Sequence, residues 1–320
     1  MEEKIRIDPH VHFRDEEQSY KETIAHGLKV AKEQGVSIVF DMPNTTRPVI
    51  NEDRVKERLV LVPKGEENKY YTYIGATKEL DQLKKAIETT QNNERVCGIK
   101  MFAGKSVGNL EILNEEDQRA VYKTLTENNF KGVFAVHCEK ESFMKNYFDP
   151  INPLSHSIAR PKEAEIESVK DQIRFAKEVG FKGNLHICHS SCSETIELVQ
   201  EAKKELRITC GVTPHHAMWN NSLMSSPLGG IYKMNPPLRG IKDQKALQDC
   251  IINGKVDWIE TDHAPHAVGE KLSSSCPSGY PSLFLYKEFV EKFLPSLGLS
   301  EKAIEAMTFD NIKSTFNIKL

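Results

Sequence analysis

Short apolar runs bounded by turn residues alternate with longer amphipathic stretches along this chain. The apolar runs have the length of buried strands, and the amphipathic stretches have the spacing of helices with one apolar face. This alternation is typical of repeated βα units around a parallel sheet. The predicted strands are 5–8, 36–42, 70–75, 96–102, 133–137, 184–189, 208–212 and 256–261. The predicted helices are roughly 20–34, 52–61, 79–90, 115–128, 163–179, 193–205, 243–252 and 282–294, with a last one near 300–312.

Eight strands, each followed by a helix, predict a closed (β/α)8 TIM barrel. The chain has 320 residues, which suits one such barrel, because this fold commonly needs about 250 residues or more. We therefore expect a single domain over 1–320. In this fold the catalytic groups come from the carboxyl ends of the strands, so chemistry is expected there.

Charge and cysteine content narrow the class of protein. The formal net charge is -3 and no basic stripe is visible, so no nucleic-acid partner is expected. No apolar run approaches the ~20 residues of a membrane span, and the chain opens without a signal-like stretch. We therefore expect a cytoplasmic protein with no membrane contact. The seven cysteines form an odd set without a CxxC pair, which argues against a disulfide framework.

Metal-capable side chains recur at the ends of the predicted strands. His10 and His12 are two residues apart on an extended segment, so their side chains share a face and can reach one cation. Four further candidates each end a strand of their own: Lys100, His137, His189 and Asp262. Imidazole and carboxylate ligands suit zinc, and more than four of them suit two bridged metals. Asp262 would complete the ion held by His10 and His12, while His137 and His189 would hold the other.

Lys100 fits this set less simply, because a protonated lysine cannot bind a cation. A lysine of depressed pKa can react with carbon dioxide to form a carbamate, which is a carboxylate and can bridge two metals. Taken alone, Lys100 is more simply a structural residue. The long loops 103–114, 139–162, 213–241 and 262–281 follow strands on the same face, where such loops usually build or cover a site. Segment 103–109 contains two glycines and is either a mobile lid or a flexible connector.

Eight segments together carry a resemblance to a known family. They are Asp-Pro-His-Val-His-Phe-Arg-Asp (8–15), Asp-Met-Pro-Asn-Thr (41–45), Gly-Ile-Lys-Met-Phe (98–102), Val-His-Cys-Glu (136–139), His-Ile-Cys-His (186–189), Thr-Pro-His-His (213–216), Asn-Pro-Pro-Leu-Arg (235–239) and Thr-Asp-His-Ala-Pro-His (261–266). With them the chain resembles the dihydroorotases of the amidohydrolase superfamily over most of its length. The metal pattern alone indicates the superfamily. Arg14, Asn44 and the Asp-His-Ala-Pro-His segment point to dihydroorotases within it.

The resemblance implies a role for each matching residue. The ligands of two divalent metals, expected to be zinc, match His10, His12, Lys100 carbamylated by carbon dioxide, His137, His189 and Asp262. Asp262 also matches the general base that deprotonates a bridging water and then, as acid, protonates the leaving nitrogen. The residues that match binding of the substrate carboxylate are Arg14, Asn44 and His266, and Asn235 matches a contact to the ring. Arg239 fits loop structuring as well as substrate binding, and Cys188 is more simply a buried thiol.

We therefore predict a dihydroorotase that interconverts L-dihydroorotate and N-carbamoyl-L-aspartate in pyrimidine synthesis. The barrel is expected without the accessory β-sandwich of many relatives, as a homodimer, and association with a transcarbamoylase is a further prediction. One alternative is another cyclic amidase: a hydantoinase, dihydropyrimidinase or allantoinase. Arg14 and Asn44 argue against it, because a substrate without a carboxylate leaves a buried guanidinium unpaired. The other alternative is a catalytically silent dihydroorotase-like subunit, against which the intact ligand set argues.

Overall fold

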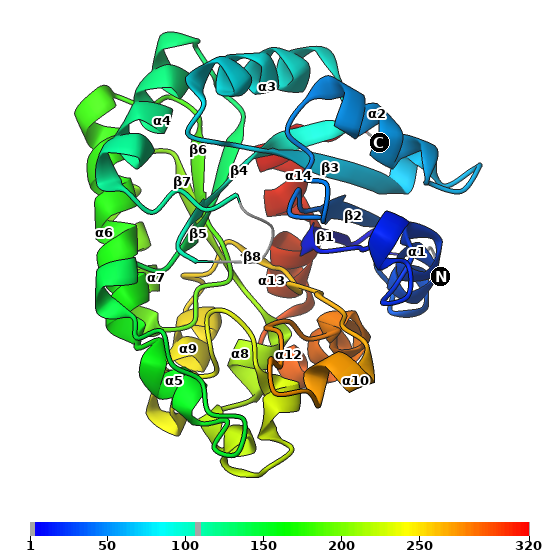
Figure 1. The fold of residues 1–320 in the computed structure, drawn as a ribbon, viewed down its shortest axis with the longest axis vertical. Helices are drawn as coiled ribbons and strands as arrows, with labels where there is room; N and C mark the ends of the chain where they lie inside the picture. The colour runs from blue at the N-terminus through cyan, green and yellow to red at the C-terminus, as the bar shows by residue number, and fades with distance from the viewer. Residues whose placement is uncertain (1–3, 106–109, 320) are drawn as a thin grey trace.

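Eight parallel strands run side by side in chain order through the centre of the structure (Figure 1). The computed structural model describes residues 4–105 and 110–319. The strands are β1 Ile7–Val11, β2 Ile38–Asp41, β3 Tyr70–Gly75, β4 Val96–Ala103, β5 Val133–Cys138, β6 Asn184–Ile187, β7 Ile208–Val212 and β8 Trp258–Ile259. Each strand pairs in parallel with the next. The predicted (β/α)8 fold is confirmed.

The seam between β8 and β1 is closed by a side chain and a single bridge. The Asp8 carboxylate accepts hydrogen bonds from the Thr261 backbone N–H at 3.0 Å and from the Thr261 hydroxyl at 2.5 Å. Further along, Val11 bridges to His263, and the His12 N–H donates to the His263 carbonyl at 2.7 Å. The carboxylate thus takes the place of ladder bonds, which explains why β8 is shorter than the predicted 256–261.

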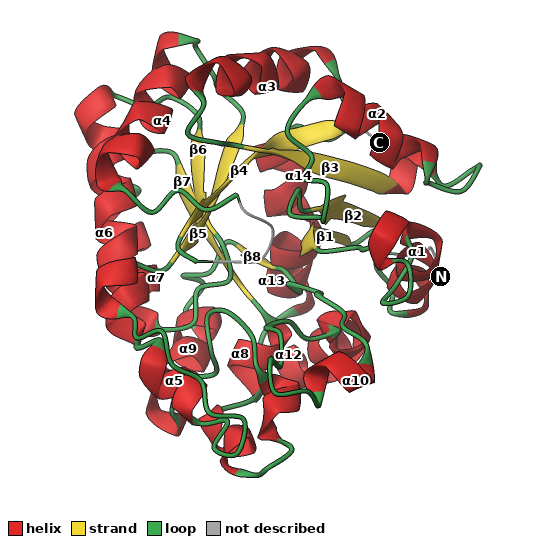
Figure 2. Ribbon diagram, viewed as in Figure 1, coloured by secondary structure: helices red, strands yellow, loops and turns green. Residues whose placement is uncertain are grey.

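Helices surround the strands (Figure 2). The α-helices are α1 Ile24–Glu33, α2 Glu52–Val60, α3 Leu80–Asn92, α4 Glu115–Glu127, α5 Ser155–Ala159, α6 Lys162–Val179, α7 Ser193–Ala202, α8 Pro214–Met218, α9 Ile241–Ile252, α10 Val268–Lys271, α11 Tyr286–Glu288, α12 Leu294–Ser296, α13 Glu301–Glu305 and α14 Asn311–Phe316. Short 3-10 turns are η1 Glu16–Gln18, η2 Glu67–Lys69, η3 Glu141–Phe143, η4 Asn221–Ser225, η5 Gly229–Tyr232 and η6 Ser282–Leu285, and π turns are η7 Phe289–Phe293 and η8 Ala306–Asp310. Helix starts follow side-chain caps: Thr23, Asn51 and Asn114 each accept a backbone N–H of the first turn.

The predicted helix 20–34 begins late, at α1, because Thr23 caps it after the η1 turn. The predicted helix 282–294 runs as η6, α11, η7 and α12, and the predicted helix near 300–312 extends through α14. These differences lie at element ends, where local side-chain bonds outweigh the periodicity of apolar residues.

The C-terminal helix closes the amino end of the barrel. Phe316, at the end of α14, makes ring contacts with Phe40 of β2, Tyr73 of β3 and Trp258 of β8. These aromatic side chains form an apolar layer with Ile7, below the carboxyl ends of the strands. The catalytic face is therefore left to the opposite end of the strands, where the long loops lie.

The described residues, 4–105 and 110–319, form one sheet and no accessory β-sandwich. Of the segment 103–109 considered as a lid, residues 106–109 lie outside the described part. Among the helices that the structure describes, none has both the length and the apolar character needed to cross a membrane.

Candidate metal and substrate site

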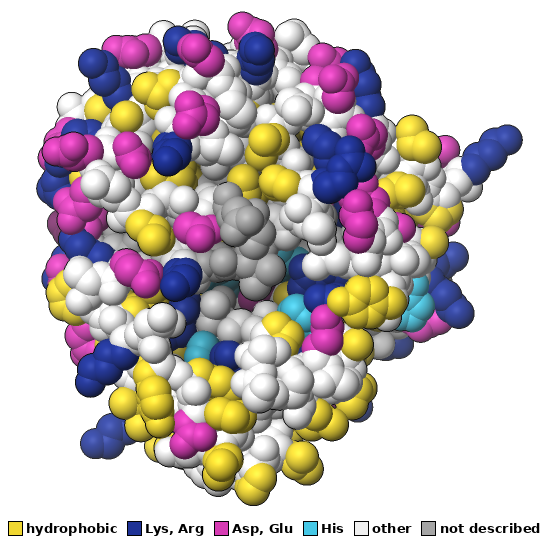
Figure 3. Space-filling model, in the orientation of Figure 1, with side chains coloured by type: hydrophobic (Ala, Val, Ile, Leu, Met, Phe, Trp, Pro, Cys, Tyr) yellow, Lys and Arg dark blue, Asp and Glu magenta, His cyan; other side chains and the backbone are white. Residues whose placement is uncertain are grey.

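A pocket lies at the carboxyl ends of the strands, and Figure 3 shows histidine and basic side chains around the hollow in this face. Its lining combines expected metal ligands with expected substrate contacts: His10, His12, Arg14, Asn44, Phe102, His137, His189, Asn235, Asp262, Ala264, Ser278 and Gly279. Residues from both ends of the chain and from its middle therefore meet at one place, as the barrel requires.

The first group of ligand atoms converges at the seam between β1 and β8. His10 Nε2 and His12 Nε2 lie 3.2 Å apart, so the two-residue spacing does bring the imidazoles to one point. Asp262 Oδ1 lies 2.9 Å from His12 Nε2 and 3.4 Å from His10 Nε2. All three residues are buried. Three ligand atoms around a common point match the arrangement expected for one cation.

The second group comes from the middle strands. His137 Nδ1, at the end of β5, lies 3.2 Å from His189 Nε2, just beyond β6. The His189 ring also lies beside His10, with centroids 5.1 Å apart, which joins the two groups. Lys100, fully buried in β4, donates to Cys188 Sγ at 2.9 Å. Burial opposes ionisation of this thiol, but the Lys100 charge and His186 lower the pKa of Cys188 to about 5.

Burial and hydrogen bonding set the protonation states of the ligands. Burial lowers the pKa of His12 to about 4 and that of His189 well below its usual range. Burial opposes ionisation of Asp262, but its hydrogen bond with His12 prevails and lowers the carboxyl pKa to about 2. In His10, burial and the Lys100 charge are outweighed by Cys188 and Glu260, which raise the pKa to about 9. A cation at His10 would therefore displace a proton.

The donor set fits a pair of divalent cations. Two pairs of ring nitrogens face each other at 3.2 Å, and facing lone pairs are unfavourable without a proton or a cation between them. His10, His189 and Asp262 each offer a ligand atom within 4.8 Å of the others. Neutral imidazole with carboxylate is a zinc-type donor set. The residues present therefore suit the metals expected from the sequence.

Arg14 supplies a cation to the same pocket. It is buried, and burial lowers the pKa of its guanidinium. Its Nε donates to the Pro265 carbonyl at 3.1 Å, and no carboxylate among the described residues forms an ion pair with it. Asn44 was expected beside Arg14 as a carboxylate contact. In the structure its Oδ1 lies 2.7 Å from His12 Nδ1, so it orients a metal ligand.

The loop after β8 forms the outer wall. Ser278 and Gly279 line the pocket, and the Lys271 ammonium holds this wall by donating to the carbonyls of Lys233, Pro277 and Gly279 at 2.9–3.0 Å. Burial lowers the pKa of Lys271 to about 8. His266, expected to contact the substrate carboxylate, lies behind the wall, with its Nε2 3.1 Å from the Ser278 carbonyl.

Asn235 and Arg239, which were also considered as substrate contacts, lie in different places. Asn235 lines the pocket, and its buried Oδ1 has no hydrogen-bond partner among the described residues. Arg239 donates to the Ser191 hydroxyl at 2.8 Å and pairs with Glu165 at 3.3 Å, so it structures the loops around α6. Cys188 is buried, as expected from the sequence.

Two buried carboxylates behind the ligands were not singled out from the sequence. Glu139 Oε2 lies 3.0 Å from His137 Nε2 and is paired with Arg160. Glu260 lies 3.7 Å from His10 Nδ1 and accepts the backbone N–H of His189. The available signal was spacing, because each carboxylate is two residues from an expected ligand at the carboxyl end of a strand: Glu139 from His137 and Glu260 from Asp262.

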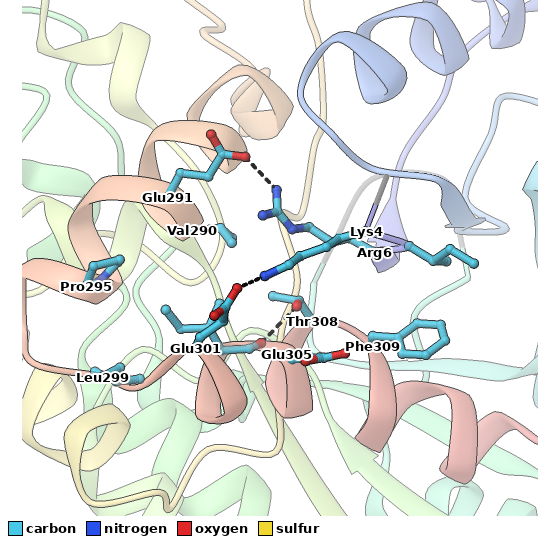
Figure 4. A pocket seen from close by; sticks show the side chains of 12 residues that line it. Lys4, Arg6, Val290, Glu291, Pro295, Leu299, Glu301, Glu305, Thr308 and Phe309 are labelled. Carbon is cyan, nitrogen blue, oxygen red and sulfur yellow. Dashed lines mark hydrogen bonds and ion pairs between the residues drawn. The ribbon is translucent and has the colours of Figure 1, made fainter. Parts of the chain in front are cut away.

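A larger cavity, of about 610 Å³, lies at the other end of β1, between the start of the chain and the C-terminal helices. Figure 4 shows that its basic side chains are already paired, Lys4 with Glu301 and Arg6 with Glu291. Its described lining contains no histidine or cysteine. This cavity therefore lacks the metal chemistry of the pocket at the carboxyl ends.

The fold and the site together define the class of this protein: an α/β barrel with a cluster of candidate metal-binding side chains at the carboxyl ends of its strands. Solved structures share the fold. The L-hydantoinase (dihydropyrimidinase) of Arthrobacter aurescens superposes with a TM-score of 0.82 at 18% identity, covering 98% of this chain and 70% of that one. The dihydroorotase of Saccharomyces cerevisiae, in complex with 5-fluoroorotic acid, gives 0.80 at 18% identity, covering 100% and 85%.

Sequence comparison names the family. The dihydroorotase of Enterococcus faecalis is 31% identical over 297 residues, which are 89% of this chain and 67% of that protein. The dihydroorotase of Aeropyrum pernix is 31% identical over 92% of this chain and 65% of its own length. No protein-family model matches. The chain belongs to the dihydroorotase family and is a cyclic amide hydrolase of that kind, and it spans about two thirds of the length of these relatives.

Proposed function

We propose that this chain interconverts L-dihydroorotate and N-carbamoyl-L-aspartate at a pair of divalent metal ions, as a cytoplasmic step of pyrimidine synthesis. The supporting observation is that one pocket holds both a convergent ligand cluster and Arg14, a buried guanidinium with no carboxylate partner in the described residues. A cyclic amide that carries a carboxylate satisfies both features at once. Hydantoin and dihydrouracil, without a carboxylate, would leave Arg14 unpaired.

When bound, two divalent cations, which we propose to be zinc, would polarise the ring carbonyl and lower the pKa of a water molecule toward neutrality. His10, His12 and Asp262 would hold one cation at the β1–β8 seam. His137 and His189 would hold the other. Behind these ligands, Asn44 fixes the tautomer of His12 by accepting from its Nδ1, so that Nε2 keeps its lone pair toward the site.

We propose that Lys100 supplies a carboxylate between these two groups as a carbamate. The neutral amine would attack carbon dioxide, a nitrogen–carbon bond would form, and the amine would lose a proton. Two features support this. Lys100 is fully buried, and its side chain ends at Cys188, next to the ligand His189. A cluster of imidazoles with one aspartate carries little negative charge, so a second anion would compensate the charge of two cations.

Arg14 would hold the exocyclic carboxylate of the substrate and thereby orient the ring amide toward the ligand cluster. A planar guanidinium suits this task, because it donates to a carboxylate through two parallel hydrogen bonds. The Asn235 amide lies in the same pocket with an unpartnered oxygen, and it would accept from a ring N–H. Binding at both ends of the ring fixes the scissile bond, which contributes to rate through orientation.

Asp262 would carry the proton. Its carboxyl pKa of about 2 keeps it ionised near neutral pH, so it can accept a proton from the attacking water. As the water oxygen bonds to the ring carbonyl carbon, the carbon–nitrogen bond breaks and Asp262 returns that proton to the departing nitrogen. The products are a ureido group and a carboxylic acid in one molecule, and the acid becomes a carboxylate by releasing the second water proton to solvent. In the reverse direction the same side chain removes the proton from the ureido nitrogen.

Parallel assays on four substrates test the assignment: dihydroorotate, hydantoin, dihydrouracil and allantoin, with purified protein reconstituted with zinc. We expect dihydroorotate to be hydrolysed with the highest kcat/KM. Preference for another ring would identify a different cyclic amidase. No turnover of any of them, with both metals bound, would identify a silent subunit.

Assembly is a separate proposal. We expect a homodimer, and light scattering of the purified chain would show its mass. Association with a transcarbamoylase would appear as co-elution of the two purified proteins.

A further inference from the structure

Glu260 is a fully buried carboxylate directly after β8, and it lies below the ligand cluster. Four N–H groups or ring nitrogens surround it. Its Oε2 lies 3.0 Å from both His186 Nε2 and the Trp258 indole nitrogen. Its Oε1 accepts the backbone N–H of His189 and lies 3.7 Å from His10 Nδ1. Three of these groups are within hydrogen-bond distance of the carboxylate, and His10 Nδ1 is an electrostatic neighbour beyond that range. An ionised carboxylate offers about four lone-pair sites, so most of them are occupied.

The barrel leaves space for this carboxylate on the neighbouring strand. A Cβ atom at Gly211 of β7 would lie 2.4 Å from the carboxyl carbon of Glu260 and 2.6 Å from each of its oxygens. Gly211 has an ordinary backbone conformation, so its lack of a side chain serves space and not a turn. The space for the carboxylate therefore depends on both Glu260 and Gly211, which lie far apart in the sequence. This dependence gives the carboxylate a specific position.

Two of the four neighbours of Glu260 are expected metal ligands. His10 turns Nδ1 toward Glu260 and Nε2 toward His12 and Asp262. At 3.7 Å the Nδ1 contact with Glu260 is an electrostatic pairing and not a hydrogen bond, and His10 Nδ1 has no hydrogen-bond partner among the described residues. The negative charge of the carboxylate favours a proton on Nδ1, which leaves the lone pair of Nε2 for a cation. His189 has a φ of 37°, in the left-handed region that is costly for a residue with a side chain. The bond from its N–H to Glu260 helps to hold this conformation.

We propose that Glu260 is the positioning residue of the metal centre: its bond fixes the backbone of His189, its charge favours the Nδ1–H tautomer of His10, and it thereby sets the affinity for both cations. This inference rests on the proposed metal site. It assigns Glu260 no contact with substrate, because the carboxylate lies beneath the ligands and does not line the pocket.

A third metal site is the main rival explanation. Ligand atoms of His10, Cys188 and Glu260 lie within 4.8 Å of one another. The contacts of Glu260 argue against it, since a cation there would have to displace donors that already occupy the carboxylate. The Cys188 sulfur already accepts a hydrogen bond as well, from Lys100 Nζ at 2.9 Å. Metal stoichiometry separates the two explanations.

The test measures zinc binding by competition with a chromophoric chelator, and records the visible spectrum of the cobalt-substituted protein. Glu260→Gln keeps the shape but offers one acceptor oxygen in place of two, and its amide N–H groups would face other donors. We expect zinc affinity to fall about 10- to 100-fold, with two metals still bound at saturation and a changed cobalt spectrum. Gly211→Ala, which leaves the charge but crowds its niche, should have the same kind of effect.

Gln172→Leu is the control for loss of a buried polar network. Gln172 is fully buried between α4 and α6, where it bonds to Tyr122 and Gln118. It should lower the Tm of the metal-free protein and leave zinc affinity unchanged. Should both site variants fail to fold, Trp258→Phe removes one donor and no charge, with an expected loss of about 2- to 10-fold.

Wild-type zinc affinity in folded Glu260→Gln, or in Trp258→Phe if that variant has to be used, would overturn the proposal. Three metals in the wild type and two in Glu260→Gln would also overturn it, by making Glu260 a ligand. The readout does not depend on dihydroorotate. Tight binding of two metals without turnover of dihydroorotate would instead refute the proposed function and leave the role of Glu260 intact.

Discussion

Replacement of Arg14 by methionine tests how the pocket recognises its substrate. The guanidinium is buried, and within the described residues it makes one hydrogen bond, to the Pro265 carbonyl, and no ion pair. Burial lowers its pKa, so the charged form is costly in the free protein. An ion pair with a substrate carboxylate would compensate the free-energy cost of this desolvation. Methionine fills a similar volume without the charge, so Arg14→Met should leave Tm and the two metal sites unchanged.

The size of the effect follows from the hydrogen bonds that would be lost. A hydrogen bond between charged groups contributes ~1.5–3 kcal/mol. At 1.36 kcal/mol for each factor of ten, kcat/KM for dihydroorotate should fall by about 10- to 160-fold for one such bond. A bidentate contact and misorientation of the ring amide would increase the loss. Any residual turnover of dihydrouracil, which has no carboxylate, should change less than about threefold, because the lost bonds do not exist for it.

The assay compares kcat/KM of wild-type, Arg14→Met and Arg95→Met proteins on both substrates, with metal content measured on the same samples. Arg95 is the matched control: burial lowers its pKa too, but its Nε donates to the Tyr70 carbonyl at the amino end of the barrel. It should retain wild-type kcat/KM. An equal fall in kcat/KM on dihydroorotate and dihydrouracil in Arg14→Met would refute the reasoning. Arg14 would then support the structure of the site without binding the substrate carboxylate.

Three further predictions concern the ligands and the loop. Lys100→Ala should abolish activity and reduce metal content, and short carboxylic acids should restore part of the rate; full activity with two metals would exclude the carbamate. Asp262→Asn should lose ~10²–10⁴-fold in kcat, and an unchanged rate with normal metal content would remove Asp262 from proton transfer. The Lys271 ammonium, with a pKa of about 8, should lose a proton and one of its three bonds above that pH, so KM should rise there. Lys271→Met should have a high KM at every pH, and identical KM profiles for the two proteins would contradict this role.

The regular part of the fold could be predicted from the sequence because it depends on local pattern. Strands β3 and β7 lie at the predicted 70–75 and 208–212. The prediction fails at strand ends that depend on distant side chains. The hydrogen bonds that Thr261 donates to the Asp8 carboxylate replace the end of β8, and these two residues are 253 positions apart. No window of neighbouring residues contains that information.

The candidate site, like the fold, could be predicted from the sequence only where it depends on local pattern. Period-two spacing was enough to bring His10 and His12 together, because alternation along a strand is a local property. The same spacing did not predict which other polar groups each side chain contacts. Asn44, expected as a substrate contact, lines the pocket and also lies against His12, and His266, expected to contact the same carboxylate, lies against Ser278. Which of several polar neighbours a side chain meets depends on loops whose course the sequence pattern does not specify.

Backbone conformation at the ligands was the least accessible feature. His189 and Asp262 have φ values of 37° and 51°, in a region that costs ~1–3 kcal/mol for residues with side chains. Sequence patterns place glycine in such positions, so neither residue would be predicted there. The surrounding contacts compensate: Glu260 accepts the His189 N–H, and the next residue, Ser190, donates to the Gly211 carbonyl at 2.8 Å. At these two residues the side chains leave the strand direction to face the candidate metal site. Gly211, which makes room for Glu260, also accepts the hydrogen bond from Ser190, the residue next to His189.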